Sequence, residues 1–308
     1  MYDLTIIGGG PGGVAAGVYA ARKRLKTLFI TPEWGGQSNV SEDVQNWIGT
    51  PHISGVELAA SLKAHLEEYK ADIVEIKEGE KVTAIEKIDS GFKVTTDAGN
   101  SFETKTVLIT AGSTRRKLAI PGADTFDNKG VTYCASCDGP LFGGQDLVVI
   151  GGGNAGFETA AQLLAYAKSV TLLQRGVEFR ADPVTVEKVL ANPKMKAITN
   201  TELIEVKGDK FVTGISYKDL GDGQIKEVAA GGIFVEIGLI PSTDFVKNVV
   251  ELNQFNQIVI DPRTQQTKTM GIWAAGDCTD VLYHQNNIAA GDAVRALEDI
   301  YMHVHKNS

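Results

Sequence analysis

Two glycine-rich segments that repeat along the chain constrain its fold more than any other feature. The segments Asp3-Leu-Thr-Ile-Ile-Gly-Gly-Gly10 and Asp146-Leu-Val-Val-Ile-Gly-Gly-Gly153 lie 143 residues apart in a chain of 308 residues, and the offset continues without a gap. Each reads as an apolar strand, the pattern Gly-x-Gly-x-x-Gly, a helix, and a second strand about 20 residues later. The repeat therefore predicts two similar β-α-β units.

The spacing of the three glycines is typical of a loop that holds a dinucleotide. The first glycine allows a tight turn, the second lets the backbone approach a pyrophosphate, and the third lets helix and strand pack closely. The pyrophosphate lies on the helix N-terminus, where free N–H groups and the helix dipole favour an anion. The alternative is a glycine-rich turn that binds no ligand. Two copies of the motif in the same strand–helix context make this alternative less favoured. The predicted loop residues are Gly8, Gly10, Pro11, Gly12 and Gly13 in the first unit and Gly151, Gly153, Asn154, Ala155 and Gly156 in the second.

Charge and composition narrow the class of protein. The chain has 38 acidic and 30 basic residues and a formal net charge of −8, which argues against nucleic-acid binding because that needs a basic surface. No apolar run approaches the roughly 18 residues of a transmembrane helix, so we expect no membrane partner. The N-terminus enters an apolar strand without the features of a signal peptide, and we expect a cytoplasmic protein.

A pair of cysteines precedes the second glycine-rich segment. Cys134 and Cys137 are separated by two residues, which in a reducing compartment indicates redox chemistry or a metal site. Such a pair can close a small disulfide on the first turn of a helix, where the thiol pKa is lowered. Zinc would need two further ligands, but Cys278 stands alone and the histidines form no ligand pair with it. We therefore expect a redox disulfide and no metal, with inert structural thiols as the remaining alternative.

Six motifs, in their order along the chain, resemble those of the low-molecular-weight thioredoxin reductases. The resemblance covers Tyr2 to about residue 300, and its specific element is the Cys-x-x-Cys-Asp placed just before the second glycine motif. Reductases of the glutathione reductase type carry their cysteines near the first glycine motif instead. The motifs are Gly8-Gly-Gly-Pro-Gly-Gly13, Glu33-Trp-Gly-Gly-Gln37, Thr110-Ala-Gly112, Tyr133-Cys-Ala-Ser-Cys-Asp138, Gly151-Gly-Gly-Asn154 and Gly276-Asp277-Cys278.

This resemblance implies an α/β fold with two Rossmann-like three-layer nucleotide-binding domains, the second inserted in the first. Residues 1–114 and 244–308 would form a discontinuous FAD-binding domain. Residues 115–243 would form the nicotinamide-binding domain that carries the cysteine pair. The same resemblance implies a homodimer.

The resemblance also implies roles for individual residues. Cys137 would face the flavin, Cys134 would exchange with a protein disulfide, and Asp138 would donate and accept the proton; a charge partner at a helix N-terminus is the plain alternative for Asp138. Cys278 would be a buried small residue. The positions expected along FAD, besides the first glycine loop, are Gly36, Gln37, Asn46, Ala111, Gly112, Gly276, Asp277 and Gln285.

The coenzyme question depends on the residues that follow the second strand of the second unit. Sites for NAD usually place an acid there and sites for NADP an arginine, whereas this chain has Gln174. Arg175 and Arg180 match two of the three arginines of the family's NADPH pattern, and Gly176 replaces the third. These residues favour NADPH, with NADH as the alternative.

Several electron acceptors and sources fit such a chain. A disulfide reductase that serves thioredoxin or a thioredoxin-like protein is favoured. A ferredoxin-fed reductase and a dithiol oxidase keep the flavin and the cysteines, and a dinucleotide-binding sensor is the non-enzymatic alternative. The segment Gly232–Pro241 also resembles the flavoprotein component of alkyl hydroperoxide reductase. That protein has an added N-terminal thioredoxin-like domain, whereas this chain starts at the FAD motif, so we expect this role less.

Overall fold

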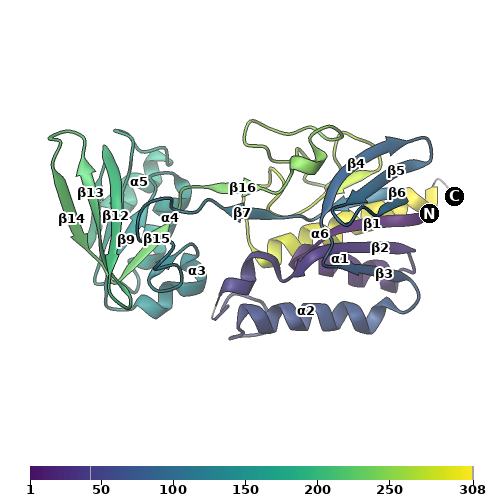
Figure 1. The fold of residues 1–308 in the computed structure, drawn as a ribbon, viewed down its shortest axis with the longest axis horizontal. Coiled ribbons are helices and arrows are strands. Elements are labelled where there is room, and N and C mark those ends of the chain that lie inside the picture. Colours follow the sequence, from purple (N-terminus) through teal and green to yellow (C-terminus); the bar gives the residue numbers. More distant parts are fainter. Residues whose placement is uncertain (42, 307–308) are drawn as a thin grey trace. The chain divides into compact units, whose positions relative to one another are not determined.

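The computed structural model divides the chain into two compact units (Figure 1). The first comprises Met1–Thr114 and Ile240–Ser308, and the second comprises Arg115–Leu239. The structure describes residues 1–41 and 43–306, apart from the side chains of Val40, Ser136 and Cys137. The protein is thus an α/β chain in which one unit is inserted in the other.

The first unit alternates strands and helices in the way that the first glycine motif predicts. Its described strands are β1 (Tyr2–Gly9), β2 (Thr27–Trp34), β3 (Val74–Glu78), β4 (Val82–Ile88), β5 (Gly91–Thr96), β6 (Ser101–Ile109) and β17 (Ile272–Ala274). Its described helices are α1 (Pro11–Arg22), η1 (Gly36–Val40), α2 (Gly55–Lys70), η3 (Asp244–Val246) and α6 (Asn286–Lys306).

These strands form one sheet in the order β3-β2-β1-β6-β5-β4, with β17 beside β6. The strands β3, β2, β1, β6 and β17 pair in parallel, whereas β5 pairs antiparallel with both β4 and β6. Ile6 lies at the centre, opposite Phe29 on one side and Leu108 on the other. The chain runs from β1 to β2 and β3 on one side and reaches β6 on the other, so the strand order reverses beside β1.

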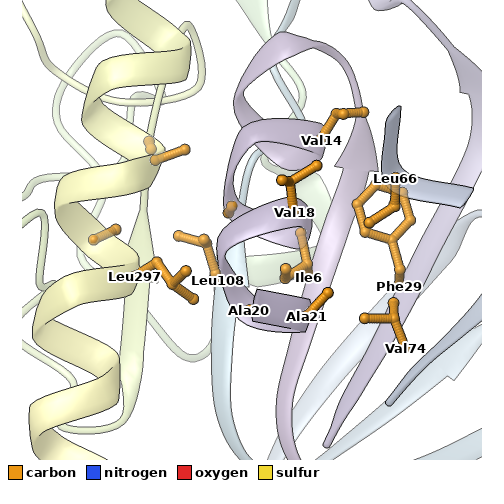
Figure 2. Close-up of a cluster of buried hydrophobic side chains, with 14 of the residues drawn as sticks. Ile6, Val14, Val18, Ala20, Ala21, Phe29, Leu66, Val74, Leu108 and Leu297 are labelled. Atoms are coloured by element: carbon orange, nitrogen blue, oxygen red, sulfur yellow. The ribbon is translucent and has the colours of Figure 1, made fainter. Parts of the chain in front are cut away.

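Side chains of the central strands alternate between two hydrophobic cores. Ile6 and Leu108 pack beneath α1 and α6, and α1 lies between α6 and Leu66 of α2 (Figure 2). Ile7 and Ile109 point to the opposite face and join a second core that includes Val246, Val250, Ile258 and Ile260. The parallel strands are buried on both faces, as a layered α/β fold requires.

The second unit repeats this plan. Its described strands are β8 (Val131–Thr132), β9 (Asp146–Ile150), β10 (Ser169–Leu173), β11 (Met195–Ile198), β12 (Thr201–Gly208), β13 (Val212–Asp219), β14 (Ile225–Ala229) and β15 (Gly232–Val235). Its described helices are α3 (Ala135–Asp138), η2 (Gly139–Phe142), α4 (Asn154–Leu163) and α5 (Pro183–Leu190).

The second unit has three layers. A parallel sheet with the order β11-β10-β9-β15-β8 forms the middle. Val149 and Phe234 pack against Phe157 of α4 on one face. Val148 packs against Ile215 of the antiparallel sheet β12-β13-β14 on the other face. Both units are therefore Rossmann-like.

The two crossings between the units are short and paired. β7 (Ser113–Arg115) and β16 (Leu239–Pro241) form a two-stranded sheet. Close to it, the N–H of Arg116 donates to the carbonyl of Gly238 at 3.0 Å. The first unit boundary follows Thr114, the position expected from the sequence, whereas the second follows Leu239 and not residue 243. Among the described residues, no helix has the length and apolar character that crossing a membrane requires.

Candidate nucleotide and disulfide sites

The first and third glycines of both loops meet steric demands of the fold. Gly8 and Gly151 have φ of +117° and +124°, a region that side-chain-bearing residues rarely adopt. A Cβ on Gly13 would lie 1.8 Å from the carbonyl oxygen of Gly8, and one on Gly156 would lie 1.9 Å from that of Gly151. These glycines therefore allow the turn and the close packing of helix on strand.

The second glycine of each loop faces open space instead. A Cβ on Gly10 or Gly153 would meet no heavy atom within 4 Å, and their φ values of −76° and −93° suit any residue. Each is the N-cap of its helix, α1 or α4, and neither helix has a side-chain cap from the described residues. Uncapped N–H groups beside open space are what a bound pyrophosphate requires. Both loops therefore fit a dinucleotide.

Two further residues of the predicted FAD set meet at the start of α6. A Cβ on Gly12 would lie 3.0 Å from the carbonyl oxygen of Ala289, and one on Gly276 would lie 3.1 Å from the Cβ of the same alanine. Pro11 occupies the first turn of α1, where its missing N–H costs nothing. The N-terminal ends of α1 and α6 thus lie against each other beside the first glycine loop.

Polar residues from distant parts of the sequence meet in the first unit. Gln37 of η1 donates from Nε2 to Oδ2 of Asp277 at 3.3 Å and to Oγ of Ser113 at 3.1 Å. Asn46 donates from Nδ2 to Oε1 of Gln285 at 3.2 Å. The structure therefore brings four predicted residues together in two pairs.

The remaining residues of the predicted FAD set follow the same edge of the sheet. Gly36 lies beside the first glycine loop, since its Cβ would lie 3.7 Å from the Cα of Gly10. Ala111 and Gly112 follow β6, and Gly112 has a φ of +64°. Ligands of open α/β sheets bind at the carboxyl ends of the strands where the strand order reverses, and here that place lies between β1 and β6.

His284 and Ser113 were not predicted as site residues. Nδ1 of His284 lies 3.4 Å from Oδ1 of Asp277, and Ser113 accepts a hydrogen bond from Gln37. Both contacts join residues far apart in the chain, which no local pattern reveals.

The loop after β10 is anchored to the second glycine loop. The N–H of Arg180 donates to the carbonyl of Gly152 at 2.8 Å. Oε1 of Gln174 accepts from the N–H of Gly152 at 3.1 Å, and its Nε2 donates to the carbonyl of Glu178 at 3.1 Å. The side chain of Gln174 thereby ties the loop that carries both predicted arginines to the glycine loop.

The arginines themselves are available to a ligand. The side chains of Arg175 and Arg180 are at least partly exposed, and neither forms an ion pair with another described residue. Asn154, at the start of α4, accepts at Oδ1 from the N–H of Asp182 at 2.8 Å, whereas Ala155 is exposed. The open end of α4 and the two guanidinium groups thus lie on connected segments.

The cysteines fall into two kinds. Cys134 is disulfide-bonded, whereas Cys278 is free and fully buried. Burial raises the pKa of the Cys278 thiol to about 12, so it is an unreactive thiol at neutral pH. The side chain of Cys137 lies outside the described residues, and its pairing with Cys134 stays a prediction. The described residues contain no group of three or more His, Cys, Asp or Glu that could hold a metal ion.

Thr132, at the end of β8, connects Cys134 with Asp138. Its hydroxyl donates to Oδ2 of Asp138 and accepts from the N–H of Cys134 at 3.3 Å. The threonine is buried, so these hydrogen bonds are shielded from water and fix both partners. Sequence reasoning missed this role because threonine is common at buried strand ends.

Two Rossmann-like units, each with a dinucleotide loop, and a disulfide-bonded cysteine define an FAD-dependent disulfide oxidoreductase. Residues 2–306 match the family described as "Pyridine nucleotide-disulphide oxidoreductase", and the chain belongs to this family.

Relatives by sequence include the F component of the alkyl hydroperoxide reductase of Staphylococcus epidermidis. It is 40% identical over 306 residues, which are 99% of this chain and 60% of the relative. A protein named NADH dehydrogenase of Bacillus subtilis is 37% identical over 306 residues, 99% of this chain and 59% of the relative. The chain thus spans about 60% of the length of these relatives.

Solved structures of thioredoxin reductases resemble the whole chain. The enzyme from Streptococcus pyogenes matches with a TM-score of 0.87 and 35% identity, covering 100% of this chain and 99% of that one. The enzyme from Giardia duodenalis matches with a TM-score of 0.88 and 32% identity, covering 98% of this chain and 99% of that one. The resemblance to thioredoxin reductases thus extends from sequence motifs to the fold.

Proposed function

We propose that the protein passes electrons from NAD(P)H through FAD to a disulfide of Cys134 and Cys137, and from there to thioredoxin or a thioredoxin-like protein. One observation carries the proposal: the disulfide-bonded Cys134 shares a hydrogen-bond network with Asp138 inside a unit that has its own dinucleotide loop. The likeness to thioredoxin reductase structures supports it. We also propose a homodimer, which sedimentation would test.

The first unit would hold FAD. The N–H groups at the start of α1 would bind the pyrophosphate, with Gly10 leaving the space for it. The pair formed by Gln37 and Asp277 and the pair formed by Asn46 and Gln285 would bind along the flavin and its ribityl chain. When bound there, FAD would supply a two-electron carrier that takes a hydride from NAD(P)H and passes two electrons on to the disulfide.

The residues of the second unit would manage the thiols and the proton. Cys134, as a thiolate, would attack the disulfide of the partner protein and form the mixed disulfide. Asp138 would protonate the departing thiolate of Cys137 and take the proton back during oxidation. Thr132 would hold the Asp138 carboxylate and the backbone of Cys134 in place through its hydroxyl.

A second acceptor is favoured by the sequence relatives. The 40% identity to the F component of an alkyl hydroperoxide reductase points to an acceptor in a peroxide-reducing system. Both acceptors present a small-protein disulfide, so the chemistry at Cys134 is the same. Turnover with a thioredoxin and with a thioredoxin-like domain of such a system, compared at equal concentration, would distinguish them.

Anaerobic stopped-flow reduction with NADPH and with NADH tests the proposed function. The account predicts that one or both coenzymes bleach the yellow flavin, and that oxidised thioredoxin or a thioredoxin-like domain then restores the colour. Bleaching by neither coenzyme would contradict the proposal and favour a ferredoxin-fed reductase or a dithiol oxidase.

The Thr132→Val variant should slow electron transfer to the disulfide about tenfold, because it loses one buried hydroxyl that hydrogen-bonds to two partly buried partners, Cys134 and Asp138. Flavin reduction by NAD(P)H should be unchanged, since that step does not use Thr132. The matched control is Thr132→Ser, which keeps the hydroxyl and should keep the rate. Single-turnover formation of the dithiol would measure this. If serine and valine slow it equally, the hydroxyl is not the cause.

We propose NADPH as the preferred coenzyme, although the name of the Bacillus subtilis relative favours NADH. No carboxylate stands at Gln174, and the guanidinium groups of Arg175 and Arg180 flank the loop. The Arg180→Ala variant should raise KM for NADPH about tenfold and barely change that for NADH, because guanidinium–phosphate bonds are charge-assisted. Steady-state kinetics would show this.

Two comparisons complete the coenzyme test. Lys196→Ala removes an exposed charge from β11 and should leave both KM values unchanged, whereas Gly176→Arg should sharpen the preference for NADPH. A wild-type kcat/KM that is higher for NADH than for NADPH would overturn the preference.

A further inference from the structure

Open α/β sheets bind their ligands in a crevice outside the carboxyl ends of the strands, at the point where the strand order reverses, and the second unit has such a reversal. In the order β11-β10-β9-β15-β8, the chain leaves β9 toward β10 and returns on the other side at β15. A dinucleotide lies across the carboxyl ends of the strands at such a reversal, with its adenosine ribose beside the residue that follows the second strand. That residue is Gln174, after β10. The nicotinamide half therefore extends toward β15.

Glu236 is the residue that follows β15, and its backbone packs against the second glycine loop. Its N–H donates to the carbonyl of Ile150 at 2.8 Å. Its carbonyl oxygen lies 2.1 Å from where Gly151 would carry a Cβ. Glu236 thus occupies the β15 wall of the crevice.

The carboxylate of Glu236 is largely buried, and hydrogen bonds from described residues reach only one of its two oxygens. Its side chain is 15% exposed, and burial raises the pKa of this carboxyl, with the neighbouring Glu158 acting in the same direction. Oε1 accepts from the hydroxyl of Thr159 at 2.9 Å and lies 4.0 Å from Nη1 of Arg115. Among the described residues, none forms a hydrogen bond with Oε2.

We infer that Glu236 faces the nicotinamide half of the coenzyme and favours its oxidised, positively charged ring. This inference rests on the proposed function. The reduced ring is neutral; when it gives a hydride, which is one hydrogen nucleus and two electrons, to FAD, a pyridinium cation remains. A negative charge in a partly desolvated crevice stabilises that cation and leaves the neutral ring almost unaffected. Arg115 offsets part of the charge at Oε1.

Binding of redox-inert ligands to the FAD-loaded full chain tests the inference. The probes are NAD⁺ and NADP⁺, which carry the cationic ring, and their 1,4,5,6-tetrahydro forms, which carry a neutral ring that does not reduce flavin. Calorimetry at about pH 8, where more of the carboxyl is ionised, should show that Glu236→Gln weakens the cationic ligands about tenfold and the neutral ones less than about twofold.

A control variant and two contrary outcomes make the test specific. Glu187→Gln removes an exposed negative charge from α5 of the same unit and should leave the ratio of the two affinities unchanged. Equal weakening of the cationic and neutral ligands in Glu236→Gln, or no weakening, would overturn the inference while the proposed function stands. If wild-type protein binds none of the probes, the proposed function fails and this inference with it. Glu236→Ala serves as a second variant with the same expected ratio should Glu236→Gln lose FAD.

Discussion

The Cys134→Ser variant should lose disulfide reduction and keep a flavin that NAD(P)H still reduces. Cys134 is disulfide-bonded, and our account makes it the thiol that exchanges with the partner protein. Its loss removes a covalent step, so turnover with thioredoxin should fall by a factor of at least about a thousand. The FAD content should not change, because the residues proposed to hold FAD lie in the other unit.

The same variant also tests the roles of the two cysteines. If Cys137 faces the flavin, its thiolate in Cys134→Ser should form a long-wavelength charge-transfer band with the oxidised flavin. A band that appears in Cys137→Ser instead would show that the roles are reversed. Cys278→Ser is the matched control, since Cys278 is free and buried, and it should keep turnover. Full turnover in Cys134→Ser would disprove the mechanism.

The second large effect concerns the two glycines that face open space. Gly10→Val should abolish FAD binding, and Gly153→Val should keep FAD but lose reduction by NAD(P)H. A Cβ at either position meets no heavy atom within 4 Å, and both backbones are extended. Valine therefore fits the protein and fills the space of the pyrophosphate, and we expect less than about a tenth of the bound nucleotide.

The absorbance ratio of flavin to protein measures the first loss, and anaerobic bleaching by NADPH measures the second. Gly13→Ala provides the contrast, because its Cβ would lie 1.8 Å from the carbonyl oxygen of Gly8. We expect this variant to be destabilised as well as depleted of FAD. Equal loss of FAD from Gly10→Val and Gly153→Val would show that the two nucleotide sites have been assigned wrongly.

The sequence was most informative where a local pattern has a single structural meaning. The repeat predicted two Rossmann-like units, and both are present. The helix Gly55–Lys70 begins at a capping box formed by Ser54 and Glu57, and Leu58, Leu62 and Leu66 repeat at helical spacing on its buried side. Each copy of the glycine motif, like the helix pattern, depends on residues within a few positions of one another. Their steric and periodic demands can therefore be read directly from the sequence.

The segment Gln257–Asp261 shows where a local pattern misleads. Its alternation of apolar residues is typical of a strand, but the segment makes only isolated bridges, such as Ile258 with Thr279 and Ile260 with Thr267. Its isoleucines are buried in the second core of the first unit. The apolar residues of this segment are therefore buried, as their alternation indicates. A strand also needs consecutive hydrogen-bonding partners on a neighbouring strand, which only the tertiary fold supplies.

The parts of the site that the sequence missed depend on contacts between distant segments. The hydrogen bond between Gln37 and Asp277 joins residues on η1 and after β17, and Glu236 gains its neighbours from α4 and the first crossing. The hydrogen bond from Thr132 to Asp138 spans only six residues, but no motif or periodic pattern predicts it. Such residues look ordinary in the sequence because their chemistry comes from the partners that folding brings to them.

An anaerobic reductive titration of the FAD-loaded protein tests the central claim most directly. The account holds that each chain stores electrons on two groups, the flavin and the disulfide of Cys134 with Cys137. Dithionite should therefore be consumed at two equivalents per flavin in the wild type and at one equivalent in Cys134→Ser, with two new titratable thiols in the reduced wild type. One equivalent in the wild type, without new thiols, would contradict the account.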